Sequence, residues 1–287
     1  MVEVPDSITV HDTVGGFRAL LDRERAAGRT VGFVPTMGYL HDGHASLMKA
    51  AAADCDLAVA SIFVNPLQFA ANEDLSTYPR DLDRDLAIAA EAGVTHVLHP
   101  TVEEMYPRTV LTTVTVAEIT RHFEGASRPE HFAGVATVVS KLLAIVGPCR
   151  AYFGDKDYQQ LAVVTRLASD LSFPAEIVGC PIVREPDGVA MSSRNVYLSE
   201  GQRAAAPVLH RALSAARDLI AAGETDAEVV RATMTQLVAT EPEAVLDYAD
   251  LVDAETLAPA GSVGGDQRLL IAAHFGSTRL LDNMPAT

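Results

Sequence analysis

Two histidines separated by two residues are the first candidates for chemistry. The segment PTMGYLHDGH runs from Pro35 to His44 and contains His41 and His44. This spacing places both rings on one side of a helical turn. A helix N-terminus favours phosphate, and imidazolium donors beside it would stabilise charge on a transferring phosphate. As an alternative, Gly38 and Gly43 serve turns and the histidines are surface residues. The spacing differs from that of a metalloprotease zinc helix, which disfavours zinc.

A second polar segment, GDKDYQQ, covers residues 154–160 and contains one of only three lysines in the chain. Lys156 follows an apolar run and precedes a helical pattern, the position at which a phosphate would bind. Asp157 could accept a hydrogen bond from a ribose hydroxyl. The alternative is that Asp155 and Asp157 cap the helix and that Lys156 is a solvated charge.

A third polar segment, MSSRN, covers residues 191–195. Two hydroxyls, an amide and a guanidinium in one short run suit a phosphate, because arginine can bind two phosphate oxygens at once. An ordinary hydrophilic loop is the alternative interpretation.

Two shorter polar segments could bind smaller groups. Asn65 and Gln68 follow an apolar run and could recognise hydroxyl or carboxylate groups, or simply end a strand. The DLDRD run at residues 81–85 could bind Mg²⁺ through one or two carboxylates. Acids are also favourable in the first turn of any helix, which is the competing explanation.

Composition excludes several classes of function. The 287 residues contain 38 acids and 22 bases, a net charge of −16 that repels a nucleic-acid backbone. No apolar run approaches the roughly 20 residues of a membrane span, and the first ten residues do not resemble a signal peptide. The three cysteines are far apart, which fits a reducing cytoplasm. We therefore expect a cytoplasmic protein that binds neither nucleic acid nor membrane.

Apolar runs and helical patterns alternate over the first two-thirds of the chain. This alternation predicts an α/β fold, a Rossmann-like doubly wound parallel sheet with helices on both faces. Ligands in such sheets bind at the carboxyl ends of the strands, where the polar segments lie. The expected strands are 30–34, 57–64, 95–98, 150–153 and 175–183, and the expected helices are 44–53, 82–92, 131–146 and 158–171.

The pattern changes after Val183 and predicts a second, smaller α+β domain. Two long alanine-rich helices, 200–222 and 226–240, precede three strand-like runs at 245–252, 268–273 and 278–281. The REPDG segment, residues 184–188, would be the linker. We expect residues 1–183 to form the domain that binds the small molecules and residues 184–287 to act as a lid.

Common nucleotide motifs are absent, but the set of polar segments resembles a known family. There is no Gly-x-x-x-x-Gly-Lys-Ser/Thr loop, no Gly-x-Gly-x-x-Gly fingerprint and no Gly-x-Ser-x-Gly elbow. The paired histidines resemble the His-x-Gly-His signature of the nucleotidyltransferase-like superfamily. Within it, seven segments match the pantoate–β-alanine ligase (pantothenate synthetase) family in order. They are PTMGYLHDGH, SIFVNPLQF, YPRDLDRDL, RPEHFAGVATVVSKL, YFGDKDYQQL, VREPDGVAMSSRNVYL and TRLLDN.

The resemblance implies functions for individual residues. It makes His44, Lys156 and Arg194 the catalytic residues, with Lys156 on phosphate and Asp157 on ribose. Gln68 and Gln160 would hold pantoate, with Gln68 bordering β-alanine, and Asp85 matches an acid that approaches Mg²⁺. The implied ATP site comprises Met37, Gly38, Tyr39, Leu40, His41, Asp42, Gly43, His44, Gly154, Asp155, Lys156, Asp157, Val183, Met191, Ser192, Ser193 and Arg194.

The resemblance also implies a reaction and an assembly. ATP, accompanied by Mg²⁺, would adenylate the carboxylate of (R)-pantoate, and β-alanine would then displace AMP to give pantothenate. Members of the family are usually homodimers, so a homodimer is expected here. Two alternatives remain: another nucleotidyl-transfer or adenylate-forming enzyme of the same superfamily, and a non-catalytic nucleotide sensor with this fold.

Several residues depart from the family pattern. Tyr39 stands where a small residue is usual, and Ala45 replaces a leucine. Asp155 replaces a glutamate, and Arg84 stands where a second carboxylate is common beside Asp85. We expect the first three changes to affect packing and the last to affect metal contacts. His131 and Phe132 belong to a matching segment for which the sequence suggests no role.

Overall fold

The computed structural model describes residues 8–69, 75 and 78–287, and within them the chain divides into two compact units. The first unit comprises Met1–Gly154 and Val163–Cys180, apart from the residues that are not described. The second comprises Asp155–Ala162 and Pro181–Thr287. Most of the segment on which the expectation of no signal peptide was based, residues 1–7, lies outside the described residues.

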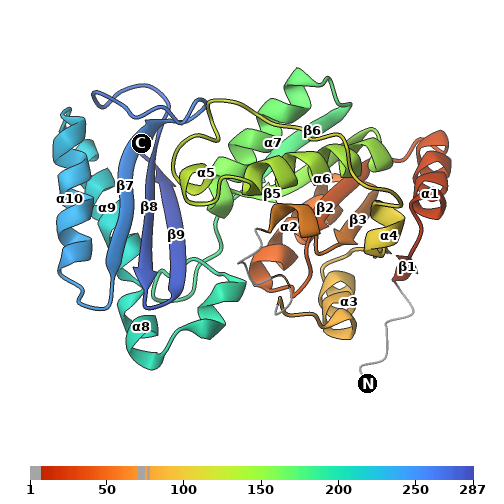
Figure 1. The fold of residues 1–287 in the computed structure, drawn as a ribbon, viewed down its shortest axis with the longest axis horizontal. Helices are drawn as coiled ribbons and strands as arrows, with labels where there is room; N and C mark the ends of the chain where they lie inside the picture. The colour runs from red at the N-terminus through yellow and green to blue at the C-terminus, as the bar shows by residue number, and fades with distance from the viewer. Residues whose placement is uncertain (1–7, 70–74, 76–77) are drawn as a thin grey trace. The chain divides into compact units, whose positions relative to one another are not determined.

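The first unit is built on a six-stranded parallel sheet (Figure 1). Its strands occur in the order β1-β4-β3-β2-β5-β6, and every neighbouring pair is parallel. All six residues of β3 are buried, as expected for a strand covered on both faces. The strands are β1 (Thr9–His11), β2 (Val31–Thr36), β3 (Leu57–Ile62), β4 (His96–Leu98), β5 (Cys149–Gly154) and β6 (Ala175–Cys180).

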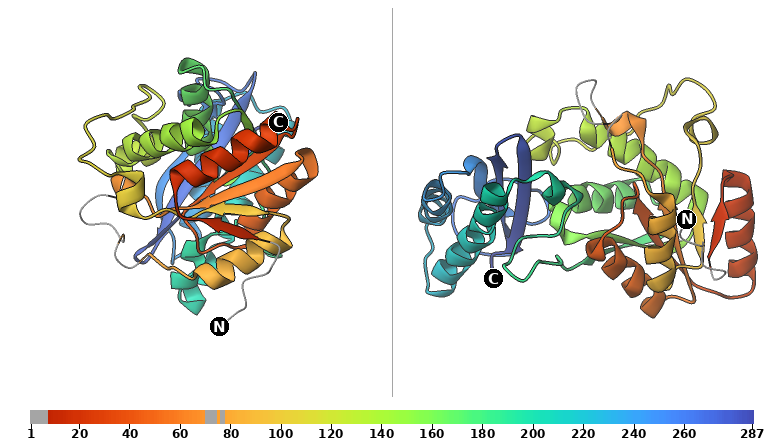
Figure 2. Two further views of the ribbon diagram at one scale, coloured as in Figure 1. Left: turned by 90° about the vertical axis from the view of Figure 1, so that its right-hand side faces the viewer. Right: turned by 90° about the horizontal axis from the view of Figure 1, so that it is seen from below.

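Helices cover both faces of this sheet, which confirms the predicted fold class (Figure 2). Helix α2 (Asp42–Asp54) contacts α3 (Leu82–Glu91) and packs over β2, β3 and β5. Helix α1 (Val14–Ala26) contacts α6 (His131–Val146), which packs against β2. The other helices of this unit are α4 (Val102–Met105), α5 (Glu124–Ser127) and the greater part of α7 (Tyr158–Asp170), and a short 3-10 turn forms η1 (Pro66–Gln68). Two further 3-10 turns, η2 (Asp155–Asp157) and η3 (Ser193–Tyr197), belong to the second unit.

The order of the strands reverses between β2 and β5. From β2 the chain continues to β3 and β4 on one side, whereas β5 and β6 lie on the other side. Ligands of open parallel sheets bind at the carboxyl edge where the order reverses. The segment that begins at Met37 leaves β2 at this point, and Gly154 is the last residue of β5.

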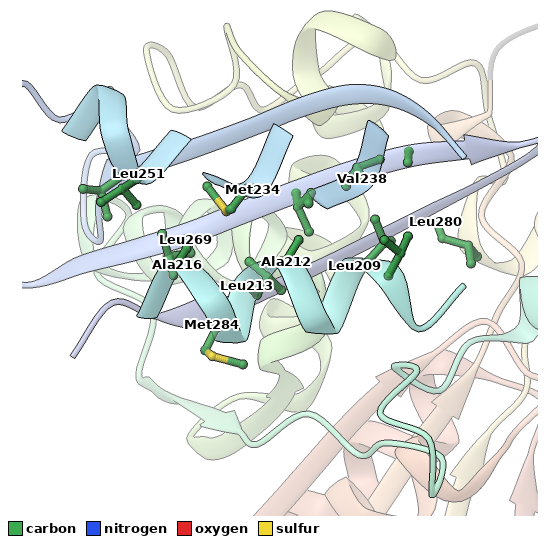
Figure 3. Close-up of a cluster of buried hydrophobic side chains, with 14 of the residues drawn as sticks. Leu209, Ala212, Leu213, Ala216, Met234, Val238, Leu251, Leu269, Leu280 and Met284 are labelled. Atoms are coloured by element: carbon green, nitrogen blue, oxygen red, sulfur yellow. The ribbon is translucent and has the colours of Figure 1, made fainter. Parts of the chain in front are cut away.

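The second unit consists of a three-stranded antiparallel sheet and three helices. Side chains from α9 (Val208–Ala221), α10 (Ala227–Ala239) and the sheet form one buried apolar cluster (Figure 3). This arrangement confirms the smaller α+β domain. The other elements are α8 (Glu200–Ala205), β7 (Val245–Asp253), β8 (Gln267–Phe275) and β9 (Thr278–Pro285), and the order in the sheet is β7-β8-β9.

The observed elements differ from the expected ones in three respects. The single helix expected over 200–222 is two helices, because Pro207 lacks an N–H and its ring prevents the helix from continuing. Strand β1 and helix α1 were not predicted; the glycines in the first turn of α1, Gly15 and Gly16, obscure its helical pattern. The domain boundary expected between residues 183 and 184 stays a prediction, while the compact units divide after Cys180.

The second unit also holds residues 155–162, which lie far from its other residues in the sequence. The Tyr158 hydroxyl donates a hydrogen bond to the Ala254 carbonyl oxygen (2.9 Å), and the Arg268 guanidinium lies 3.9 Å from the centre of the Tyr158 ring. Through these two contacts the first turn of α7 packs against β8 and the turn that follows β7.

Among the described residues, no helix combines the length and the apolar character that crossing a membrane would need.

A glycine in α6 allows the closest approach between a helix and the loop after β3. A Cβ atom added at Gly134 would lie 2.5 Å from the Cα of Gln68 and even closer to the carbonyl oxygen of Leu67. The carbonyl oxygen of Gly134 also accepts a hydrogen bond from the Asn65 amide (3.2 Å). Any side chain at this position would therefore displace η1 from α6.

We expect Gly134→Ala to lower the free energy of unfolding by about 2 kcal/mol or more, because the methyl group overlaps backbone atoms that cannot rotate away. Chemical denaturation followed by circular dichroism measures this change. Gly15→Ala is the matched control. Gly15 lies in a different helix, α1, and a Cβ atom added there would have no neighbour within 4 Å. Equal stabilities for the two variants would contradict the packing argument.

Candidate functional site

The two histidines predicted from the sequence form the N-terminus of α2. The Gly43 N–H donates to Nδ1 of His41 (3.1 Å), and the His41 N–H donates to Nδ1 of His44 (3.4 Å). The ring centroids are 4.1 Å apart. A ring nitrogen that accepts from an N–H carries no proton, so in this reciprocal cap Nε2 is the nitrogen through which each ring can donate. The cap therefore orients both rings as the sequence-based hypothesis of histidine donors requires.

A buried carboxylate holds the loop that leads to these histidines. The two oxygens of Asp85 accept hydrogen bonds from the backbone N–H groups of Tyr39 (2.7 Å) and Leu40 (2.6 Å). Asp85 is only 1% exposed, and burial raises the pKa of its carboxyl group, while the bonds from Leu40 and Tyr39 act in the opposite direction. Asp85 therefore stabilises the connection between β2 and α2.

This loop requires unusual backbone geometry, and Asp85 is in contact with it. Gly38 has a φ of +85°, and a Cβ at this position would lie 2.9 Å from a carboxylate oxygen of Asp85. Tyr39 follows with a φ of +52°, a conformation that disfavours a residue with a bulky side chain. The two hydrogen bonds to Asp85 offset part of this cost.

Two departures from the family pattern lie against each other. The guanidinium of Arg84 lies 5.2 Å from the centre of the Tyr39 ring, within the range of a cation–π interaction. Arg84 Nη1 is also 4.0 Å from an oxygen of Asp85. The cation at position 84 therefore packs on the aromatic ring at position 39, which gives a physical reason for the presence of both residues.

The amide of Gln68 has a defined orientation. Its Oε1 accepts from Nδ2 of the fully buried Asn65 (3.1 Å), and its Nε2 lies 3.0 Å from the sulfur of Met37. Oδ1 of Asn65 accepts from the hydroxyl of Tyr106 (2.8 Å), and burial raises the pKa of Tyr106 to about 12. The hydroxyl therefore stays protonated as a donor, and Gln68 directs its NH₂ group toward Met37.

The segment around His131, to which the sequence assigned no role, contacts the backbone of Gln68. Nδ1 of His131 is 3.1 Å from the carbonyl oxygen of Gln68, and Nη2 of Arg128 donates to the same oxygen (3.4 Å). Together with Gly134, these residues place the start of α6 against η1. The matching segment RPEHFAG thus positions Gln68.

In the second unit, the segment 155–157 forms the 3-10 turn η2 before α7. Nζ of Lys156 is 3.4 Å from Oδ1 of Asp157, so its ammonium group lies at the start of the helix. Asp155 lies 3.6 Å from Nη2 of Arg268; burial raises the pKa of Asp155, and Arg268 opposes that rise. The departure from glutamate to aspartate therefore leaves an acid that pairs within this unit.

The third polar segment is the end of a short hairpin. Val183 accepts from the Met191 N–H (2.9 Å), and Arg184 pairs with Ala190 as an isolated bridge. Ser192 then caps η3, its hydroxyl accepting from the Arg194 N–H (3.2 Å). The predicted segment 191–194 is thus held at one end by a backbone hydrogen bond to Val183.

The predicted residues therefore fall into two groups. Residues 37–44 lie with Gln68 and Asp85 in the first unit, and Gly154 ends β5 of the same unit. Residues 155–157, 183 and 191–194 belong to the second unit, as does Gln160, which is partly exposed on α7.

Sequence reasoning missed Asp282 and Asn283, which contact two of these segments. Both are buried in β9, which extends beyond the expected strand 278–281. Strands are depleted of aspartate and asparagine, so the adjacent pair was a usable signal only once the full strand was known.

The predicted Mg²⁺ contact of Asp85 stays a prediction, because the described contacts of its carboxylate are with backbone N–H groups and an arginine. Both of its oxygens already accept backbone hydrogen bonds, and its neighbour is Arg84 instead of a second acid. Within the described ranges, no group of three or more histidine, cysteine, aspartate or glutamate side chains could hold a metal ion. The proposed Mg²⁺ contact of Asp85 has no support from these contacts, and Mg²⁺ is better treated as part of the nucleotide substrate.

Comparison with known proteins gives one family. A family model described as pantoate-beta-alanine ligase matches residues 9–285. Pantothenate synthetase of Heliobacterium modesticaldum is 53% identical over 263 residues, covering 91% of this chain and 94% of the relative. The protein of the same name from Moorella thermoacetica is 52% identical over 272 residues and covers 95% and 96% of the two chains.

Solved structures agree with this result. Pantothenate synthetase from Thermus thermophilus has a TM-score of 0.92 and 48% identity, and the match covers 97% of this chain and 99% of that one. A pantoate-beta-alanine ligase from Francisella tularensis, complexed with beta-gamma ATP and beta-alanine, has a TM-score of 0.78 and 32% identity over 97% and 98% of the chains.

We expect Asp85→Asn to lower the free energy of unfolding by about 1–3 kcal/mol, since the amide can accept only one of the two N–H groups and turns its own NH₂ toward the other. Denaturant titration measures the change. Asp83→Asn, on the exposed side of the same helix, is the matched control and should cost under about 1 kcal/mol. If both variants are as stable as the unmodified chain, Asp85 does not hold the loop.

Proposed function

The chain belongs to the pantoate–β-alanine ligase family, and we propose that it catalyses the family reaction with the residues predicted from its sequence. The family model covers nearly the whole chain, and this is the observation that carries the proposal. The chain is accordingly an ATP-dependent carbon–nitrogen ligase that joins pantoate and β-alanine to form pantothenate.

The reaction has two steps in which atoms and charges balance. A carboxylate oxygen of (R)-pantoate attacks the α-phosphorus of ATP, the bond to the β-phosphate breaks, and pyrophosphate leaves. The amine of β-alanine then attacks the acyl carbon of pantoyl adenylate, AMP leaves, and the nitrogen loses a proton. Adenylation is necessary because a free carboxylate has no good leaving group. No covalent bond to the protein is required.

In the first unit, we assign His44 to the phosphates of ATP. Its proton on Nε2 can donate to a phosphate oxygen while Nδ1 keeps its cap on α2. Residues 37–43 would line the nucleotide beside it, close to the reversal point of the sheet, although most of their N–H groups already have acceptors within the protein. Support comes from the cap geometry, in which Nδ1 of His44 is the ring nitrogen that contacts the backbone of its own helix.

In the second unit, we assign Lys156 and Arg194 to the phosphates and Asp157 to the ribose. Positive charge is needed because one anion attacks another, and these two cations supply it. Val183 would contact the adenine through its backbone, and Ser192 and Ser193 would add hydroxyl donors. As a lid, residues 184–287 would shield the adenylate from water.

Gln68 suits the carboxylate-bearing substrate. Asn65 occupies its carbonyl oxygen, so the group that remains for a ligand is the NH₂. An NH₂ group donates to a carboxylate or a hydroxyl oxygen. Pantoate carries both kinds of group, and β-alanine carries a carboxylate. Gln160 would provide a second amide for pantoate.

The remaining parts of the proposal concern the metal, the assembly and the location. Mg²⁺ would enter with ATP as its usual partner, neutralising phosphate charge. We propose that the chain acts as a homodimer in the cytoplasm, as expected from the family resemblance and from three separated cysteines.

The reaction is tested by pyrophosphate release from MgATP. We expect release when pantoate is added, with AMP and pantothenate appearing only once β-alanine is present. Pyrophosphate must appear before AMP, because the amine of β-alanine attacks the adenylate that the first step forms. If ATP binds but pantoate triggers no release, the carboxylate substrate is wrong.

The residue assignments are tested by substitution. We expect His44→Ala and Lys156→Ala each to slow adenylation by ~10²–10³-fold, because each removes a donor that stabilises charge in the transition state. Single-turnover formation of pyrophosphate measures this step. The exposed residues Lys49 and His274 provide controls as alanine variants, which should keep the full rate. A rate within a few-fold of the unmodified chain in either test variant contradicts its assignment.

A further inference from the structure

The TRLLDN segment matches the family pattern, yet the reaction described above leaves it without a role. It lies on β9, where Asp282 is 4% exposed and Asn283 is 2% exposed. Adjacent residues of a strand point to opposite faces, so these two side chains leave the strand in opposite directions. Leu280 and Met284 share the face of Asp282 and belong to the apolar core with α9 and α10. Asn283 therefore points away from that core.

The side chain of Asn283 uses all of its hydrogen-bonding groups. Nδ2 donates to the carbonyl oxygens of Asp155 (2.9 Å) and Lys156 (2.8 Å), and Oδ1 accepts from Nε of Arg268 (2.7 Å). One NH₂ group thus binds two successive peptide carbonyls. Two consecutive carbonyls cannot both bind one amide unless the backbone between them adopts a single conformation, here the turn η2.

Asp282 holds the other predicted segment from the opposite face. Its carboxylate pairs with both terminal nitrogens of Arg184 (2.6 and 2.9 Å), and Arg184 also donates to the Gly188 carbonyl oxygen (2.9 Å). These bonds fasten the hairpin that ends at Met191. Asp282 thus connects β9 to this hairpin on one face of the strand, while Asn283 binds the turn η2 on the other face.

We propose that Asn283 is a positioning residue for ATP binding that acts through Lys156; this inference rests on the proposed function of Lys156. By holding the peptide units on both sides of the Lys156 Cα, Asn283 sets the direction in which the side chain leaves the backbone. Arg268 in turn fixes the orientation of the Asn283 amide, because it occupies the carbonyl oxygen and leaves only the NH₂ group for the turn.

Asn283→Asp is the sharpest test. The shape is preserved and the contact with Arg268 becomes an ion pair, but a carboxylate oxygen now faces the two carbonyl oxygens and repels them. We expect the Kd for MgATP, measured by calorimetry, to rise about tenfold, the equivalent of one lost hydrogen bond. Arg279 lies on the same strand as Asn283 and forms a partly exposed ion pair with Asp247 of β7; Arg279→Gln removes this pair and should leave the Kd unchanged.

A double-mutant cycle separates positioning from general destabilisation. In the Lys156→Ala background, Asn283→Asp should change the Kd for MgATP by less than about twofold, because the side chain that Asn283 positions is gone. Equal weakening in both backgrounds, or no weakening in either, overturns the inference. Asn283→Ala, which adds no charge, provides the same cycle if the aspartate variant does not fold.

Failure of the proposed function gives a different result. If Lys156→Ala itself binds MgATP as tightly as the unmodified chain, the phosphate role of Lys156 is wrong and the inference falls with it. If Lys156→Ala weakens binding while both Asn283 variants do not, only the inference is wrong.

Discussion

The carboxylate of Asp85 is the interaction on which the first group of predicted residues depends. It binds the N–H groups of Tyr39 and Leu40 in a loop where two successive residues have positive φ. Without this carboxylate, the two backbone N–H groups would lack acceptors in the protein. The loop would also lose the two hydrogen bonds that offset part of the cost of its positive φ angles. The cap formed by His41 and His44 follows directly, so their orientation depends on a residue that lies in a different helix.

The same design recurs at the other predicted segments. Gln68 is oriented by Asn65 and Tyr106 and held through its backbone by Arg128 and His131. A polar side chain that would contact substrate is thus oriented by a second polar group, here the fully buried Asn65. Such second partners reduce the number of conformations that must be lost when a ligand binds.

Several features could be predicted from the sequence because they depend on local order along the chain. The alternation of apolar runs with helical patterns predicted the parallel sheet, and the change of pattern after Val183 predicted the smaller domain. Pro207 is likewise a local signal in the sequence, since it separates α8 from α9. The roles of Asn283 and His131 could not be predicted, because their partners at residues 155–156 and at Gln68 are distant in sequence.

By itself the sequence determined the fold class, the family and the short polar segments that carry the chemistry, since each is encoded by neighbouring residues. Only the tertiary structure decided which way those residues face. The orientation of the histidine pair, the donor side of Gln68 and the structural use of Asp85 all result from hydrogen bonds, and for Asp85 these bonds join separate elements. The physical reason is that a buried polar group must find a partner, and folding alone determines which partners are within reach.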